Sequence, residues 1–263
     1  MSAHFVDQAF PMLDAERIAA FFPLARGERL SVAGEVDSTQ APLLAAAASL
    51  PDGSVVLSDC QRAGRGRRGR AWQSPPGASL ALSMLAHSPK GGRWPPALAL
   101  ALGVAAAEAL HRLGADGVRL KWPNDLLFDG DKLGGILVEN CPGGVVAGIG
   151  INLRLRDEDR ACIGQPSSDL FDAGGGVEPE TLAAAIILAW DEVFESVRSG
   201  RIGAWLDRWA LLDALRGRRV RVESGAQRLE GLALGIDGEG LLRVEVDGLA
   251  RSFASAEVSV RPA

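Results

Sequence analysis

Hydrophobic and polar residues in the first 215 positions follow two spacings, one typical of strands and one typical of helices. A polar triplet, Asp37-Ser38-Thr39, supplies residue types that cap helix N-termini, and Pro95-Pro96 suits a first helical turn. Strands are predicted at 30–36, 54–58, 79–86, 118–122, 126–128, 133–139 and 145–153. Helices are predicted at 13–22, 95–114, 180–198 and 202–213. A further, alanine-rich helix is predicted directly after the polar triplet at 37–39. The glycine-rich or polar segments 62–70 and 154–178 are expected to be loops.

The C-terminal part of the chain has a different pattern. Beyond Arg216, short alternating runs such as V-R-V-E and L-L-R-V-E-V are separated by glycine turns, which is typical of a small all-β barrel. We therefore expect an α/β domain over 30–215, a barrel over 216–263, and a lead-in over 1–29.

Composition favours an ordinary globular protein. The chain has 263 residues, of which 47% are hydrophobic and 23% charged. Its three cysteines, Cys60, Cys141 and Cys162, form no C-x-x-C pair, which indicates a reducing compartment rather than a disulfide framework or zinc site. The longest apolar run, 97–107, is too short to cross a bilayer. We expect a cytoplasmic protein without a membrane anchor.

Positive charge is concentrated in one segment although the whole chain carries a net charge of -5. Five arginines fall within 62–70 with three glycines and no acidic residue between them, which predicts a local anion site. The segment is not a P-loop, because no G-K-[ST] follows the glycines. An RNA-binding Gly/Arg tract is the alternative, but the acidic balance and the lack of interleaved aromatic residues count against it. These arginines are Arg62, Arg65, Arg67, Arg68 and Arg70.

Two further motifs lie at or near predicted strand ends. In K-W-P-N-D at 121–125 the proline ends a strand and holds Asn124 and Asp125 at its terminus. Lys132 then precedes a mostly apolar strand, where it either snorkels to water or binds an anion. In G-I-G-I-N-L at 148–153 two glycines leave room for a flat group, and Asn152 offers a donor and an acceptor.

Taken together, D-S-T at 37–39, the Gly/Arg segment, K-W-P-N-D-L, K-L-G-G-I-L-V-E at 132–139 and G-I-G-I-N-L resemble, in order and spacing, the biotin protein ligases. The resemblance implies an α/β (α+β) fold with a mixed central sheet flanked by helices, like class II synthetases and biotin and lipoate ligases, and a C-terminal SH3-like barrel. It implies formation of biotinyl-5'-adenylate from biotin and ATP with Mg²⁺, then transfer of biotin to a lysine of the biotin carboxyl carrier protein of acetyl-CoA carboxylase. The short lead-in implies a monofunctional ligase without a DNA-binding domain. A homodimer is compatible with the family, whereas nucleic-acid and membrane partners are not expected.

The same resemblance implies a role for individual residues. The implied biotin-binding residues are Ser38, Thr39, Gln40, Gln61, Gly64, Arg65, Gly66, Arg67 and Lys132. The implied ATP- and adenylate-binding residues are Arg67, Arg70, Trp72, Asn124, Lys132 and Asn152. The implied catalytic residues are Lys132, Arg67, Arg70 and Asp125, the last to orient the incoming lysine or a metal. No dedicated protein ligands for the metal are assigned, since Mg²⁺ would be carried by the ATP phosphates.

Two other activities fit the sequence less well. Lipoate ligases and octanoyltransferases share the implied architecture, but the full arginine segment followed by K-W-P-N-D disfavours them. Nucleophilic catalysis is disfavoured because His4, His87 and His111 adjoin no G-x-S-x-G elbow. The histidines are assigned no role.

Overall fold

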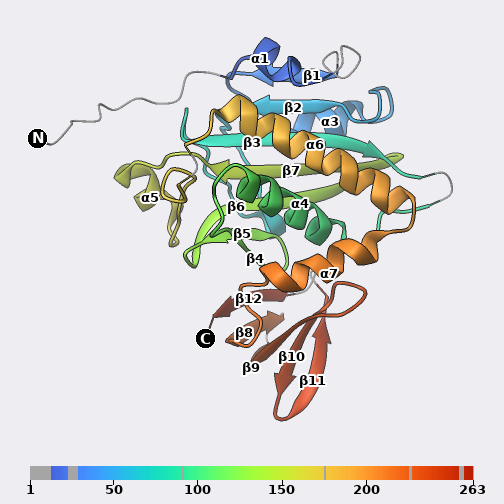
Figure 1. Ribbon diagram of the computed structural model, residues 1–263, viewed down its shortest axis with the longest axis vertical. Coiled ribbons are helices and arrows are strands. Elements are labelled where there is room, and N and C mark those ends of the chain that lie inside the picture. The colour runs from blue at the N-terminus through green and yellow to red at the C-terminus, as the bar shows by residue number, and fades with distance from the viewer. Residues whose placement is uncertain are drawn as a thin grey trace, which may run out of the picture.

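A computed structural model describes residues 13–22, 29–89, 92–174, 176–224, 227–254 and 258–262 (Figure 1). Its centre is a seven-stranded mixed sheet with the order β1-β2-β3-β7-β6-β5-β4. Strands β1 and β2 are parallel, and every other neighbouring pair is antiparallel. The strands are β1 (Leu30–Ala33), β2 (Val55–Ser58), β3 (Ser79–His87), β4 (Arg119–Lys121), β5 (Asp125–Phe128), β6 (Asp131–Cys141) and β7 (Gly144–Asn152).

Most helices cover one face of this sheet. The long helices α4 (Leu98–Arg112) and α6 (Pro179–Arg198) pack on each other in front of the strands, and α1 (Ala15–Ala19) contacts α6 and β1 (Figure 1). Helix α7 (Ile202–Leu212) packs against α4 and leads to the C-terminal sheet. The apolar run predicted at 97–107 is confirmed as a buried helical segment. On the opposite face α3 (Gln40–Ala46) contacts β2, β3 and β7.

The two faces of the central strands carry different side chains because successive residues of a strand point to opposite faces. On β7, Val145, Ala147, Ile149 and Ile151 join the main hydrophobic core beneath α4 and α6. The alternate positions are Val146, Gly148, Gly150 and Asn152, of which only Val146 joins the small cluster beneath α3. This second face is therefore a nearly flat surface of small residues beyond α3.

The C-terminal unit is a five-stranded antiparallel sheet with the order β11-β10-β9-β8-β12. A small all-β unit at this end of the chain was predicted from the alternating pattern. Its strands are β8 (Arg219–Ser224), β9 (Gln227–Ile236), β10 (Leu242–Val246), β11 (Leu249–Phe253) and β12 (Val258–Pro262).

Four local predictions differ from the structure. The segment 154–178 is not only a loop, because it contains α5 (Asp157–Ile163), at whose N-terminus Oδ2 of Asp159 accepts from the backbone N–H and from Nε of Arg156, each at 3.0 Å. Helix α1 is shorter than the predicted 13–22, and β1 ends at Ala33 rather than at position 36. Thr39 occupies the N-cap of α3 but makes no side-chain cap.

No described helix is long and apolar enough to span a membrane.

Candidate functional site

The floor of the site is the flat face of β3, β7 and β6. Its residues include Ser83, Gly148, Gly150 and Gly135, which lie on paired positions of the three strands. A Cβ atom on Gly148 would lie 2.8 Å from Oε1 of Gln40 and 3.0 Å from Oγ of Ser83. A Cβ on Gly150 would collide with the indole ring of Trp72. Glycine is therefore required at both positions for the present packing.

A cluster of buried polar side chains lies at one end of this floor. Ser38, Thr39 and Gln40 are each no more than 6% exposed. The Thr39 hydroxyl lies 2.7 Å from the Ser83 hydroxyl, and Oε1 of Gln61 accepts from the Thr39 backbone N–H at 2.9 Å. This explains why Thr39 does not cap α3: its hydroxyl is engaged by β3 instead. The cluster presents neutral donors and acceptors, which suit an uncharged polar group such as a urea or amide.

The Gly/Arg segment folds over the floor as a short hairpin. Its backbone is closed by bonds from Trp72 N–H to the Gly64 carbonyl at 2.8 Å and from Gly66 N–H to the Arg70 carbonyl at 2.7 Å. The 3-10 turn η1 (Arg67–Gly69) forms its tip. The segment predicted to bind an anion is thus a structured loop.

The arginines of this hairpin point in different directions. Arg67 donates to Oδ1 of Asn124 at 3.3 Å, and Arg65 lies 3.4 Å from Oε2 of Glu139 on β6. Burial lowers the pKa of the Arg67 guanidinium, while the charge of Asp125 acts in the opposite direction. Arg62 turns away to Asp37 and Glu35.

Arg70 is exposed, and within the described residues its side chain has no hydrogen bond or ion pair with the other candidates. The structure therefore brings Arg67 to the site but does not bring Arg70 to Lys132.

Charged side chains meet at the middle of the floor. Nζ of Lys132 lies 2.8 Å from Oδ1 of Asp125, and Nζ of Lys121 lies 3.8 Å from Oδ2 of the same carboxylate. Nζ of Lys132 also lies 5.7 Å from the centroid of the Trp72 ring. The sequence left open whether the Lys132 ammonium extends to water or binds an anionic group. In the structure it is paired with the Asp125 carboxylate. The indole Nε1 of Trp72 is buried without a hydrogen-bond partner among the described residues, so this ring offers an unused donor.

Both candidate asparagines tie backbone segments together. Asn124 donates to the Ile136 carbonyl at 2.9 Å, which connects the K-W-P-N-D turn to β6. Asn152 is 2% exposed and donates to the carbonyls of Lys132 and Ser168. Its amide nitrogen is thus engaged by the backbone, whereas the sequence predicted that this side chain offers both a donor and an acceptor to a ligand.

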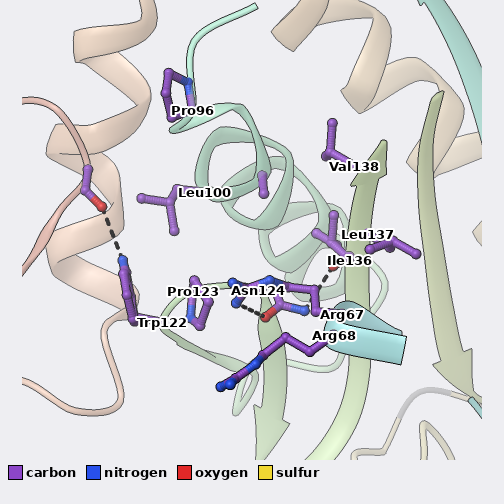
Figure 2. A pocket seen from close by; sticks show the side chains of 12 residues that line it. Arg67, Arg68, Pro96, Leu100, Trp122, Pro123, Asn124, Ile136, Leu137 and Val138 are labelled. Atoms are coloured by element: carbon purple, nitrogen blue, oxygen red, sulfur yellow. Dashed lines mark hydrogen bonds between the residues drawn. The ribbon is translucent and has the colours of Figure 1, made fainter. Parts of the chain in front are cut away.

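Two cavities adjoin the floor. The larger, about 330 Å³, is lined by Arg67, Arg68 and Asn124 on one side and by apolar residues of α4 and β6 on the other (Figure 2). The smaller, about 40 Å³, lies between Trp72, Lys132 and Asn152 and the α5 segment. Arg160 braces that segment through Asp169 and Asp172, each at 2.7 Å.

The described residues contain no group of three or more His, Cys, Asp or Glu side chains that could hold a metal ion. The nearest carboxylate on the floor, Asp125, is already paired with two ammonium groups. The described part of the chain therefore offers no resident protein site for a metal ion.

Sequence reasoning missed two residues of the site. Ser83 contacts Thr39, and Glu139 pairs with Arg65. The alternation S-L-A-L-S along β3 was a signal for Ser83, because it places Ser79 and Ser83 on the face opposite the leucines.

Comparisons with known proteins agree over nearly the whole chain. The Biotin/lipoate A/B protein ligase family model matches residues 33–155, and the Biotin protein ligase C terminal domain model matches 216–261. Bifunctional ligase/repressor BirA of Escherichia coli is 37% identical over 242 residues, covering 90% of this chain and 75% of that protein. Biotin--[acetyl-CoA-carboxylase] ligase of Mycobacterium tuberculosis is 35% identical over 247 residues, covering 88% of each.

Among solved structures, biotin protein ligase from Aquifex aeolicus in complex with biotin and ATP superposes with a TM-score of 0.79. It is 26% identical, and the match covers 89% of this chain and 99% of that one.

Proposed function

The chain belongs to the biotin protein ligase family, and from this premise we propose that it joins biotin to AMP and then transfers biotin to a carrier-protein lysine. The acceptor would be the biotin carboxyl carrier protein of acetyl-CoA carboxylase, as the names of relatives from Mycobacterium tuberculosis and Paracoccus denitrificans suggest.

The observation that carries the proposal is the order of groups along the floor. Neutral polar groups lie beside Gly148, the Lys132 ammonium lies in the middle, and the smaller cavity lies beside Asn152. Gly148 and Asn152 are four positions apart on β7, which is roughly 13 Å of strand. An elongated molecule with a ureido ring at one end, a carboxyl group in the middle and a nucleotide beyond would meet a matching group at each point.

In the first step a carboxylate oxygen of biotin attacks the α-phosphorus of ATP, and the bond to the departing pyrophosphate breaks. Two anions must approach and further negative charge develops on the phosphoryl oxygens. We propose that Lys132 and Arg67 lower this barrier, because fixed cations aimed at developing charge stabilise a transition state. Both lie beside the floor and near Asp125.

In the second step the acceptor amine attacks the acyl carbon, an amide bond forms and AMP leaves with the bonding electron pair. The ammonium of the incoming lysine must first lose a proton. Asp125 is the carboxylate proposed to orient that group, since it lies at the middle of the floor and already binds ammonium ions of the chain itself.

Magnesium would be carried by the ATP phosphates, since the described residues offer no ligand cluster for it. We place the enzyme in the cytoplasm, in keeping with three free cysteines. Dimerisation remains part of the proposal.

Isotope exchange between pyrophosphate and ATP tests the first step directly. Purified protein is incubated with biotin, lipoate, octanoate or no acid, and labelled ATP is measured. Exchange that requires biotin supports the proposal. Exchange with lipoate or octanoate alone would change the substrate, and absence of exchange with every acid would overturn the ligase assignment.

A further inference from the structure

One of the contacts between the C-terminal sheet and the central domain is a tight turn at 237–241. The turn is closed by the bond from Asp237 N–H to the Leu241 carbonyl at 3.0 Å. One carboxylate oxygen of Asp237 accepts the N–H groups of Glu239 and Leu241 at 3.0 and 2.9 Å. These bonds give the turn a defined shape, so its tip can serve as a fixed contact.

The tip of the turn is Gly240, which packs against α4. It has a φ of +80°, and a Cβ there would lie 2.7 Å from Cβ of Ala97 and 2.8 Å from Cδ1 of Leu100. Gly240 also accepts a hydrogen bond from the indole N–H of Trp122 at 3.1 Å (Figure 2). Trp122 is 1% exposed, so this buried donor is satisfied by a residue of the other sheet.

Trp122 belongs to the K-W-P-N-D motif that supplies two site residues. Asn124 follows it and is bound to Ile136 twice, through its carbonyl and through its side chain, each at 2.9 Å. Asn124 also accepts from Arg67, and Asp125 pairs with Lys132. A shift of Trp122 would therefore move the groups that contact both candidate catalytic cations.

The same turn lines the larger cavity. Gly240 and Trp122 form part of its wall together with Arg67, Arg68 and Asn124. A second tie lies just before the motif, where the N–H of Ala214, in the connection to the C-terminal sheet, donates to the Leu120 carbonyl at 2.8 Å.

We propose that the Asp237–Leu241 turn is a positioning element of the active site, acting through Trp122 to hold Asn124 and Asp125 in place. The expected effect of the turn on kcat rests on the proposed ligase function. Its effect on the positions of Asn124 and Asp125 does not depend on that function. The C-terminal sheet thus completes a wall of the site in addition to extending the core.

The test compares two glycine substitutions with similar backbone strain. Gly240 and Gly248 have φ values of +80° and +76°, but a Cβ on Gly248 would meet nothing within 4 Å. Gly240→Ala and Gly248→Ala should therefore share the conformational cost, while only Gly240→Ala should displace the contact with α4 and Trp122. A third variant, Asp237→Ala, loosens the turn without adding an atom at the contact.

Hydrogen–deuterium exchange of the Ile136 amide reads out the geometry without any catalysis, because this N–H is bonded to the Asn124 carbonyl. Exchange should accelerate in Gly240→Ala and Asp237→Ala but not in Gly248→Ala. Unchanged exchange in both turn variants, or an equal change in Gly248→Ala, would overturn the proposal.

Kinetics then tests the link to the site. Gly240→Ala should lower kcat by about tenfold or more, since small misplacements of catalytic groups have effects of this size. The KM for biotin should not change, because the cluster of buried polar side chains around Thr39 and Gln61 lies at the other end of the floor. A variant that has accelerated hydrogen–deuterium exchange at Ile136 but a native kcat would also overturn the proposal that the turn positions the active site. A native protein without biotin-dependent activity would instead contradict the ligase function, and the exchange measurement would still decide whether the turn holds Asn124.

Discussion

Nζ of Lys132 and Oδ1 of Asp125 lie 2.8 Å apart, on residues that belong to two adjacent strands of the sheet. The contact joins the K-W-P-N-D turn to the start of β6, and the same ammonium faces the Trp72 ring. The cation proposed for adenylation and the carboxylate proposed for transfer are therefore in direct contact, and their roles can be separated only by substituting each one.

Lys132→Gln should slow biotin-dependent pyrophosphate exchange by about 10²–10³-fold, because a fixed positive charge aimed at the developing negative charge is lost. Asp125→Asn should slow transfer to the carrier protein, measured from preformed biotinyl-adenylate, by about 10²-fold, because the incoming lysine is no longer oriented, and it should slow exchange less. Equal losses of both half-reactions in both variants would contradict the division of roles.

Arg67→Gly should release biotinyl-adenylate into solution and label lysines of bystander proteins. Arg67 connects the Gly/Arg hairpin to Asn124, so its loss should loosen the cover over a reactive intermediate. Chromatography of the released adenylate and labelling of added albumin measure the effect. Arg62→Gly is the matched control because Arg62 points to Asp37 instead. If Arg67→Gly modifies only the carrier protein, the hairpin does not retain the intermediate.

Gly148→Ala should raise the KM for biotin by about tenfold or more, because the added methyl group crowds Gln40 and Ser83 at the floor. Gly203→Ala is the control, since a Cβ at this position of α7 meets nothing within 4 Å. It should keep native kinetics and gain about 0.5–1 kcal/mol of unfolding free energy from better helix propensity. A normal KM in Gly148→Ala would place biotin elsewhere.

Asp213→Asn should raise the free energy of unfolding at pH 7. Burial raises the pKa of Asp213, with the bonds from Leu215 and Arg216 and the Arg216 charge acting in the opposite direction. The carboxyl thus binds its proton more tightly in the folded protein. The protonated carboxyl therefore contributes to the free energy of unfolding at low pH, and this contribution is lost as the pH rises from the unfolded pKa of about 3.9 through the folded pKa.

The asparagine cannot ionise and can still accept the Leu215 N–H, which donates to Oδ1 at 2.8 Å. Urea unfolding of both proteins at pH 7 and at pH 4 measures the difference, which should shrink toward zero at the lower pH. A variant less stable than the native protein at pH 7 would contradict the expected sign.

Local patterns predicted much of the fold and failed where distant contacts decide. Alternation placed Gly148 and Gly150 on one strand, and proline predicted the end of the strand before Asn124. Helix α5 was missed because its sequence is polar and it is supported by Arg160, whose partner Asp169 lies beyond the helix. The Trp122–Gly240 bond spans 118 residues, and no local pattern reports such a contact.

The alternation along β7 also constrains how the protein can change. Deleting or inserting one residue in this strand would turn Ile149 and Ile151 onto the floor and the glycines into the core. Substitutions can adjust the width of the site, but its length is fixed by the register of the sheet. Adaptation to a longer or shorter acid would therefore require changes at the ends of the floor, in segments 61–72 and 154–169, where an insertion leaves the strand register intact.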